Sequence, residues 1–109
     1  MATEQVLLRS VNEGSDTRHL EASLNEDGDL MIEGRDYGDG VEEFFGCREY
    51  EWVWTIRSAD LAALLNALGT KTDILFALQE RFSGERAADL KPFLDEHKIP
   101  HDVWSRARD

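Results

Sequence analysis

The hydrophobic period of this chain changes once, near residue 57, from two residues to about 3.6 residues. Before that point apolar and polar residues alternate, which is typical of strands with one covered face. After it, apolar residues recur three and four positions apart, which is typical of amphipathic helices. Strands grouped first and helices grouped afterwards favour an α+β fold over a βαβ arrangement. We therefore predict an antiparallel sheet of about four strands, packed against two to three C-terminal helices.

Strand patterns occupy four segments of the first half: 6–11, 19–24, 30–35 and 50–57. A turn is expected over 12–16. Asp27-Gly28 predicts a hairpin, because Asp-Gly supplies the positive φ angles of a type I′ turn. In the last strand one face is apolar and is expected to pack under the helices: Tyr50, Trp52, Trp54 and Ile56. Residues 34–47, rich in glycine and acidic residues, predict a long loop, either without regular structure or with one irregular strand.

Helical patterns run from Ser58 to Gly69, from Thr72 to Gly84, and from about Arg86 to His97. Pro92 either kinks the third helix or marks a fresh start at its first position. Val103 and Trp104 follow, and we expect them to dock the tail onto the core. With 109 residues the chain fits a single domain, 1–109.

Three features of the sequence bear on the cellular compartment in which the protein is expected. No apolar run approaches the ~20 residues that a membrane span requires. The first five residues are polar and lead directly into a strand pattern, so no signal peptide is expected. Cys47 is the only cysteine and cannot form an internal disulfide, which favours a cytoplasmic location.

The formal net charge is -11, and it is unevenly distributed. Residues 1–51 carry 14 acidic and 4 basic side chains, whereas residues 52–109 carry 9 and 8. Such a field repels phosphate backbones and anionic lipid, and it attracts cationic partners or metal ions. Nucleic acids and membranes are therefore disfavoured as partners, although the same acidity is equally consistent with solubility alone.

Motifs for metal binding and catalysis are weak. Asn25, Asp27 and Asp29 have the spacing of a calcium loop, but Leu30 stands where that loop needs glycine. The three histidines and Cys47 lack a zinc spacing, and no Gly-x-Ser-x-Gly nucleophile motif occurs. We predict no catalytic residue, no metal ligand and no cofactor.

Binding to another protein is the function class that the sequence favours after these alternatives. Carboxylates beside aromatic rings suit a basic partner, because the rings provide binding energy and the charges provide steering. The residues predicted to bind the partner lie in or next to the acidic loop: Asp36, Tyr37, Asp39, Glu42, Glu43 and Phe44.

In size and acidity the chain resembles the immunity proteins that neutralise bacterial nuclease toxins, and inhibitors that mimic nucleic acid. Residues 8–16 and Tyr50-Glu51-Trp52 are also similar to a group of small bacterial, chiefly actinobacterial, proteins without an assigned function. That second resemblance extends over most of the chain and implies no activity.

The leading hypothesis is a non-enzymatic, immunity-type inhibitor that engages a basic protein, such as a toxin, as a monomer or a homodimer. One alternative is a single-stranded nucleic-acid-binding module that stacks bases on Tyr50, Trp52 and Trp54. A second alternative is an enzyme that uses carboxylates and Mg²⁺.

Overall fold

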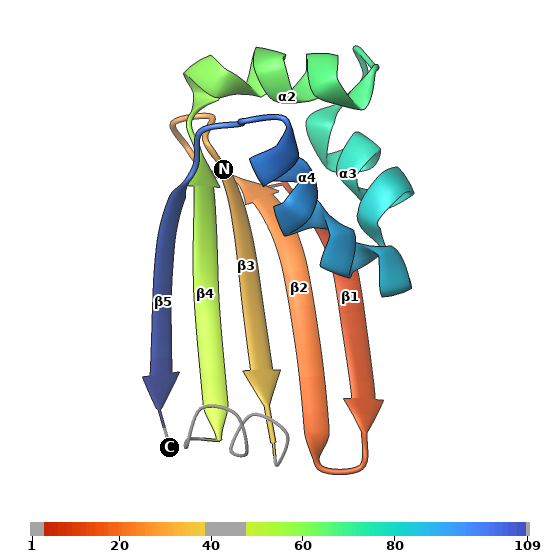
Figure 1. Ribbon diagram of the computed structural model, residues 1–109, viewed down its shortest axis with the longest axis vertical. Helices are drawn as coiled ribbons and strands as arrows, with labels where there is room; N and C mark the ends of the chain where they lie inside the picture. Colours follow the sequence, from red (N-terminus) through yellow and green to blue (C-terminus); the bar gives the residue numbers. More distant parts are fainter. Residues whose placement is uncertain (1–3, 39–47, 109) are drawn as a thin grey trace.

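Five strands form one antiparallel sheet whose order follows the sequence (Figure 1). The computed structural model describes residues 4–38 and 48–108. The strands are β1 (Gln5–Glu13), β2 (Asp16–Leu24), β3 (Leu30–Tyr37), β4 (Glu49–Ile56) and β5 (Asp102–Arg108). Each strand pairs with the next strand in the sequence. β4 and β5 also pair, although all the described helices lie between them in the chain.

The helical insertion confirms the predicted α+β class. Its elements are η1 (Ser58–Asp60), α2 (Leu61–Leu68), α3 (Ile74–Phe82), η2 (Gly84–Asp89) and α4 (Leu90–Glu96). In Figure 1, α3 and α4 lie at the β1 and β2 side of the sheet, and α2 runs across its end. Within the described ranges, no helix is long and apolar enough to cross a membrane.

The fifth strand was not predicted, and it corrects the expectation for the tail. β5 pairs with β4 from Thr55↔Asp102 to Glu49↔Arg108. Val103 and Trp104 are 59% and 48% exposed, so the prediction that they dock onto the core is wrong. The segment is held by the backbone hydrogen bonds of the sheet, which a hydrophobic pattern does not report.

Both early hairpins form, but one turn differs from its prediction. Glu13 pairs with Asp16, and Gly14 in the tight turn between them has a φ of 63°. The β2–β3 hairpin contains five residues instead of a two-residue type I′ turn, since Leu24 pairs with Leu30. In this loop the Asn25 side chain accepts hydrogen bonds from the backbone N–H groups of residues 27 and 29, at 2.9 and 3.0 Å.

Helix starts also differ in detail from the sequence patterns. Ser58 opens a 3₁₀ turn, and its backbone N–H donates to Asp29 Oδ1 at 2.8 Å. The second helix begins with Asp73 as N-cap, whose Oδ1 accepts from the N–H groups of Leu75 and Phe76. Pro92 is the third residue of α4, in the first turn, where its missing N–H costs nothing. A new helix does start here, but two residues earlier than the predicted start at Pro92.

The core lies between one face of the sheet and the helices. A β-bulge at Leu8 shifts the β1 register, so that Leu8 and Leu20 are both buried. Ile56 belongs to the buried cluster and Trp52 and Trp54 pack against it, which confirms the predicted covered face of β4 for these three residues. Tyr50 lies outside that cluster. The fully buried larger side chains come from both layers: Leu8, Leu20, Leu30, Ile32, Ile56, Leu64, Leu78, Leu90 and Leu94.

Candidate functional site

The opposite face of the sheet is not covered by any helix of the described ranges, and we call it the open face. Its side chains alternate with those of the core, and the strand registers arrange them in rows across the sheet. The central row consists of Leu7, Glu21, Glu33, Val53 and Trp104. The row beside it consists of Ser10, His19, Arg35, Glu51 and Arg106.

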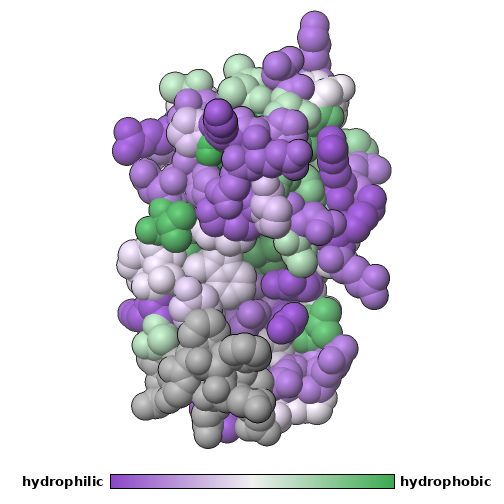
Figure 2. Space-filling model, in the orientation of Figure 1, coloured by the Kyte–Doolittle hydropathy of each residue, from purple (hydrophilic) through white to green (hydrophobic). Residues whose placement is uncertain are grey.

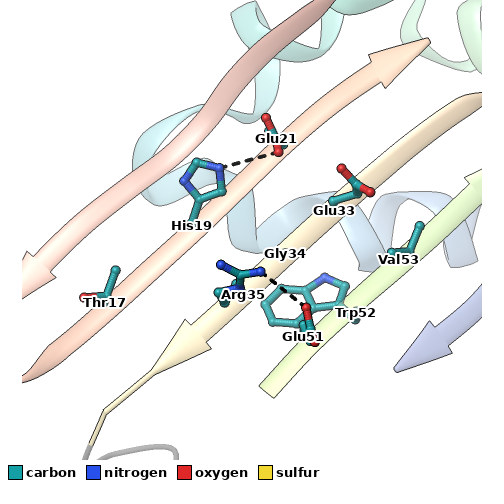
Figure 3. Close-up of a pocket in the computed structure, with 9 residues that line it drawn as sticks. All are labelled: Thr17, His19, Glu21, Glu33, Gly34, Arg35, Glu51, Trp52 and Val53. Atoms are coloured by element: carbon teal, nitrogen blue, oxygen red, sulfur yellow. Dashed lines mark hydrogen bonds and ion pairs between the residues drawn. The ribbon is translucent and has the colours of Figure 1, made fainter. Parts of the chain in front are cut away.

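Two carboxylates stand opposite each other in the central row. Glu21 of β2 pairs directly with Glu33 of β3, and Figure 3 shows both side chains on the same face. Among the described residues, the Glu21 carboxylate has one possible ion-pair partner, His19. Glu21 Oε1 lies 3.8 Å from His19 Nε2, and the imidazole is positively charged only when it is protonated. The side-chain carboxylate of Glu33 forms no ion pair or hydrogen bond with the part of the chain that the structure describes. Because like charges directly opposite destabilise a sheet, this pair does not serve the fold.

Apolar side chains flank the carboxylates. Leu7 on β1 and Trp104 on β5 are 47% and 48% exposed at the two ends of the row. Val53 is half-buried beside Glu33. A shallow depression of about 400 Å³ lies over the middle strands (Figure 3) and is lined by Thr17, His19, Glu21, Glu33, Gly34, Arg35, Glu51, Trp52 and Val53. The open face thus combines unbalanced negative charge with large exposed apolar groups.

The neighbouring carboxylates of the open face are matched by arginines. Arg35 Nε lies 3.2 Å from Glu49 Oε1, and its Nη2 lies 3.5 Å from Glu51 Oε2. Arg106 Nε donates to Glu51 Oε1 at 3.0 Å. Part of the acidity of the first half is therefore neutralised within the sheet, and the unbalanced charge of this face is concentrated at Glu21 and Glu33.

The predicted site residues that the structure describes lie on opposite faces of β3. Tyr37 pairs with Thr17 and Glu49 on the open face, where it is 44% exposed. Asp36 lies on the helix-bearing face, opposite Arg18 of β2. The structure therefore does not bring Asp36 and Tyr37 into one surface. Asp39, Glu42, Glu43 and Phe44 lie outside the described residues.

Asp36 belongs to a small polar cluster beside the core. Burial raises the pKa of its carboxyl group, and the nearby charges of Arg18 and Arg9 partly oppose that effect. Three buried atoms in this region have no hydrogen-bond partner among the described residues: Arg9 Nε, Asp36 Oδ1 and Trp52 Nε1. No three potential metal ligands gather in residues 4–38 and 48–108.

Sequence reasoning missed Glu21 and Glu33 as site residues. Their alternation with Ala22 and Ile32 indicates an uncovered face, but only the register places one opposite the other. Trp104 was missed because its strand was missed. Comparisons of the chain with known protein families, with curated proteins and with solved structures found no match. Function is therefore inferred from the geometry of the open face.

Proposed function

We propose that this protein is a non-enzymatic binding protein whose open face engages a basic protein partner, in the manner of an immunity-type inhibitor. One observation carries this proposal. Glu21 and Glu33 stand directly opposite each other, and Glu33 has no counter-ion among the described residues. Residues that oppose the stability of their own fold are most often kept for binding or catalysis.

A lysine or arginine of the partner supplies the missing positive charge. Placed between the two carboxylates, it replaces a repulsion with two charge-assisted hydrogen bonds. Covering the half-buried carboxylates with a second protein also removes water, which strengthens this attraction. The net charge of -11 steers a cationic partner towards the chain and increases the association rate.

Apolar contacts provide the remaining affinity. Trp104 and Leu7 stand at either end of the row that contains both carboxylates, and both are about half exposed. Tryptophan is among the residues that contribute most at protein interfaces, whereas scattered charges at the rim contribute little. Tyr37 is exposed on the same face and belongs to the proposed surface, whereas the predicted residues Asp39, Glu42, Glu43 and Phe44 lie outside the described part of the chain.

The position of the aromatic residues of β4 supports a protein partner over single-stranded nucleic acid. The Tyr50–Trp52 and Trp52–Trp54 ring centroids are 5.7 and 6.2 Å apart. Trp52 and Trp54 pack against the core, so their rings are not free stacking platforms. The matched arginines of the open face likewise leave no continuous positive track for a phosphate backbone.

Paired charge-removal variants test the proposal. The wild-type protein is used to capture a partner from its host, and the affinity of the purified pair is then measured by surface plasmon resonance. Glu21→Gln with Glu33→Gln is expected to weaken binding by about tenfold or more, and to reduce its salt dependence. The control is Glu26→Gln with Glu80→Gln, which changes the net charge equally at exposed positions elsewhere.

Two results would contradict the proposal. If both double variants lost the same affinity, net charge rather than the open face would determine binding. If the wild-type protein retained a single-stranded oligonucleotide tightly in a low-salt titration, the nucleic-acid alternative would replace the protein partner.

A further inference from the structure

The two edges of the sheet are protected to different degrees. At the β1 edge, the bulge at Leu8 interrupts the regular register, and Gln79 Nε2 of α3 donates to the Leu7 carbonyl at 3.3 Å. Bulges and covering side chains are the means by which proteins prevent an edge strand from pairing further. At the β5 edge, the structure describes no bulge, and all residues from Asp102 to Ala107 are exposed.

The β5 edge also lacks the two residue types that most often prevent edge strands from pairing. Residues 102–107 contain neither proline nor lysine. Arg106, one of the two arginines of β5, donates to Glu51 of the neighbouring strand. On the helix-bearing face, Figure 2 shows pale and green side chains over β4 and β5, beside the purple surface of the helices. Because α3 and α4 lie at the far side of the sheet, the β5 edge is accessible (Figure 1).

The sequence of β5 complements itself in antiparallel register. When two copies pair with Ser105 opposite Ser105, Val103 of each copy faces Ala107 of the other, and Trp104 faces Arg106. Each of these pairs joins side chains on the same face, since Val103 and Ala107 share the helix-bearing side and Trp104 and Arg106 share the open side. One pair is apolar, and the other joins a cation to a ring. Within one chain Arg106 already lies over the Trp104 ring, at 5.5 Å from its centroid.

We propose that two copies of this chain associate through their β5 strands, with a two-fold axis at Ser105. An antiparallel pair of identical strands satisfies the two-fold symmetry of a homodimer, because each contact occurs twice. The dimer joins both sheets into one continuous sheet and both open faces into one surface. This inference does not depend on the proposed function, since it concerns backbone pairing at an edge and not the carboxylates of the central row.

Charge substitutions at the symmetric position test the dimer directly. Ser105→Lys places two like charges opposite each other at the axis, and Ser105→Glu does the same with the opposite sign. Sedimentation analysis is expected to show the wild type approaching the two-chain mass as concentration rises, and each variant remaining at the one-chain mass. An equimolar mixture of the two variants is expected to recover the two-chain mass. The matched control, Ser10→Lys on exposed β1, is expected to dimerise like the wild type.

Cross-linking provides a second measurement that does not require a charged edge. In a Cys47→Ser background, Ser105→Cys is expected to form an intermolecular disulfide under mild oxidation, because residues directly opposite in a sheet lie about 5 Å apart. Val103→Cys is expected to remain uncross-linked, since the two copies of residue 103 stand about 13 Å apart along the strand. A wild-type protein that stays monomeric at about 1 mM would overturn the proposal. Equal dissociation by Ser10→Lys, or cross-linking through residue 103 instead of 105, would also overturn it.

Discussion

The indole of Trp52 lies across Gly34 on the neighbouring strand, in the space that a side chain at position 34 would occupy. A β-carbon on Gly34 would stand 2.1 Å from both Cε2 and Cζ2 of the indole. The two residues are directly paired between β3 and β4, and both lie on the helix-bearing face. Glycine is therefore required here by close packing and not by a turn.

Replacing this glycine tests that packing. Gly34→Ala gains strand propensity, but it forces the indole away from a half-buried position beside the core, and we expect a net loss of about 1–3 kcal/mol in the free energy of unfolding. Urea denaturation monitored by tryptophan fluorescence measures the loss. In a Trp52→Ala background the same substitution should cost much less. Equal costs in both backgrounds would show that the contact is not what constrains position 34.

The facing carboxylates of Glu21 and Glu33 are expected to lower the stability of the fold, although we propose that they support partner binding. Glu33→Gln removes a repulsion from Glu21 and is expected to raise the unfolding free energy by about 0.2–1 kcal/mol. The comparison is Glu51→Gln, which weakens contacts with Arg35 and Arg106 and is expected to lower stability. Chemical denaturation of both variants at low salt measures the two effects. A Glu33→Gln variant less stable than the wild type would mean that the carboxylate has a structural role.

Asp36 predicts a pH-dependent effect. The pKa of its carboxyl group is raised in the folded protein because burial outweighs the attraction of Arg18 and Arg9. Its contribution to stability is therefore fully present below the unfolded pKa and is lost as the pH rises through the folded pKa. Asp36→Asn avoids this loss, so we expect a higher melting temperature than wild type at neutral pH.

Thermal melts from about pH 3 to about pH 7 check this expectation. The advantage of Asp36→Asn should shrink as the pH falls below the usual pKa of an aspartate. Asp27→Asn, at an exposed position in the β2–β3 loop, is the control and should show no such trend. A constant difference between Asp36→Asn and wild type at every pH would indicate that the substitution acts through packing instead of charge.

Much of the fold is encoded in local patterns. Alternation in the first half gives β1 to β4, and the helical period gives the buried positions of α2 to α4, because burial of one face imposes its period on the sequence. The chain segment from 102 to 108 has no such signal. Its residues from Asp102 to Ala107 are exposed, and β4, more than forty residues earlier, holds them through backbone hydrogen bonds.

The candidate site, like the fold, was determined partly by local sequence patterns and partly by tertiary structure. The sequence by itself determined the acidity of the first half and which residues alternate towards the uncovered side, since these follow from composition and from the two-residue period of a strand. Only the tertiary structure decided that Glu21 stands opposite Glu33 and that Glu51 is matched by arginines. The physical reason is register. Which side chains meet across strands depends on pairing between distant segments, and no local pattern specifies it.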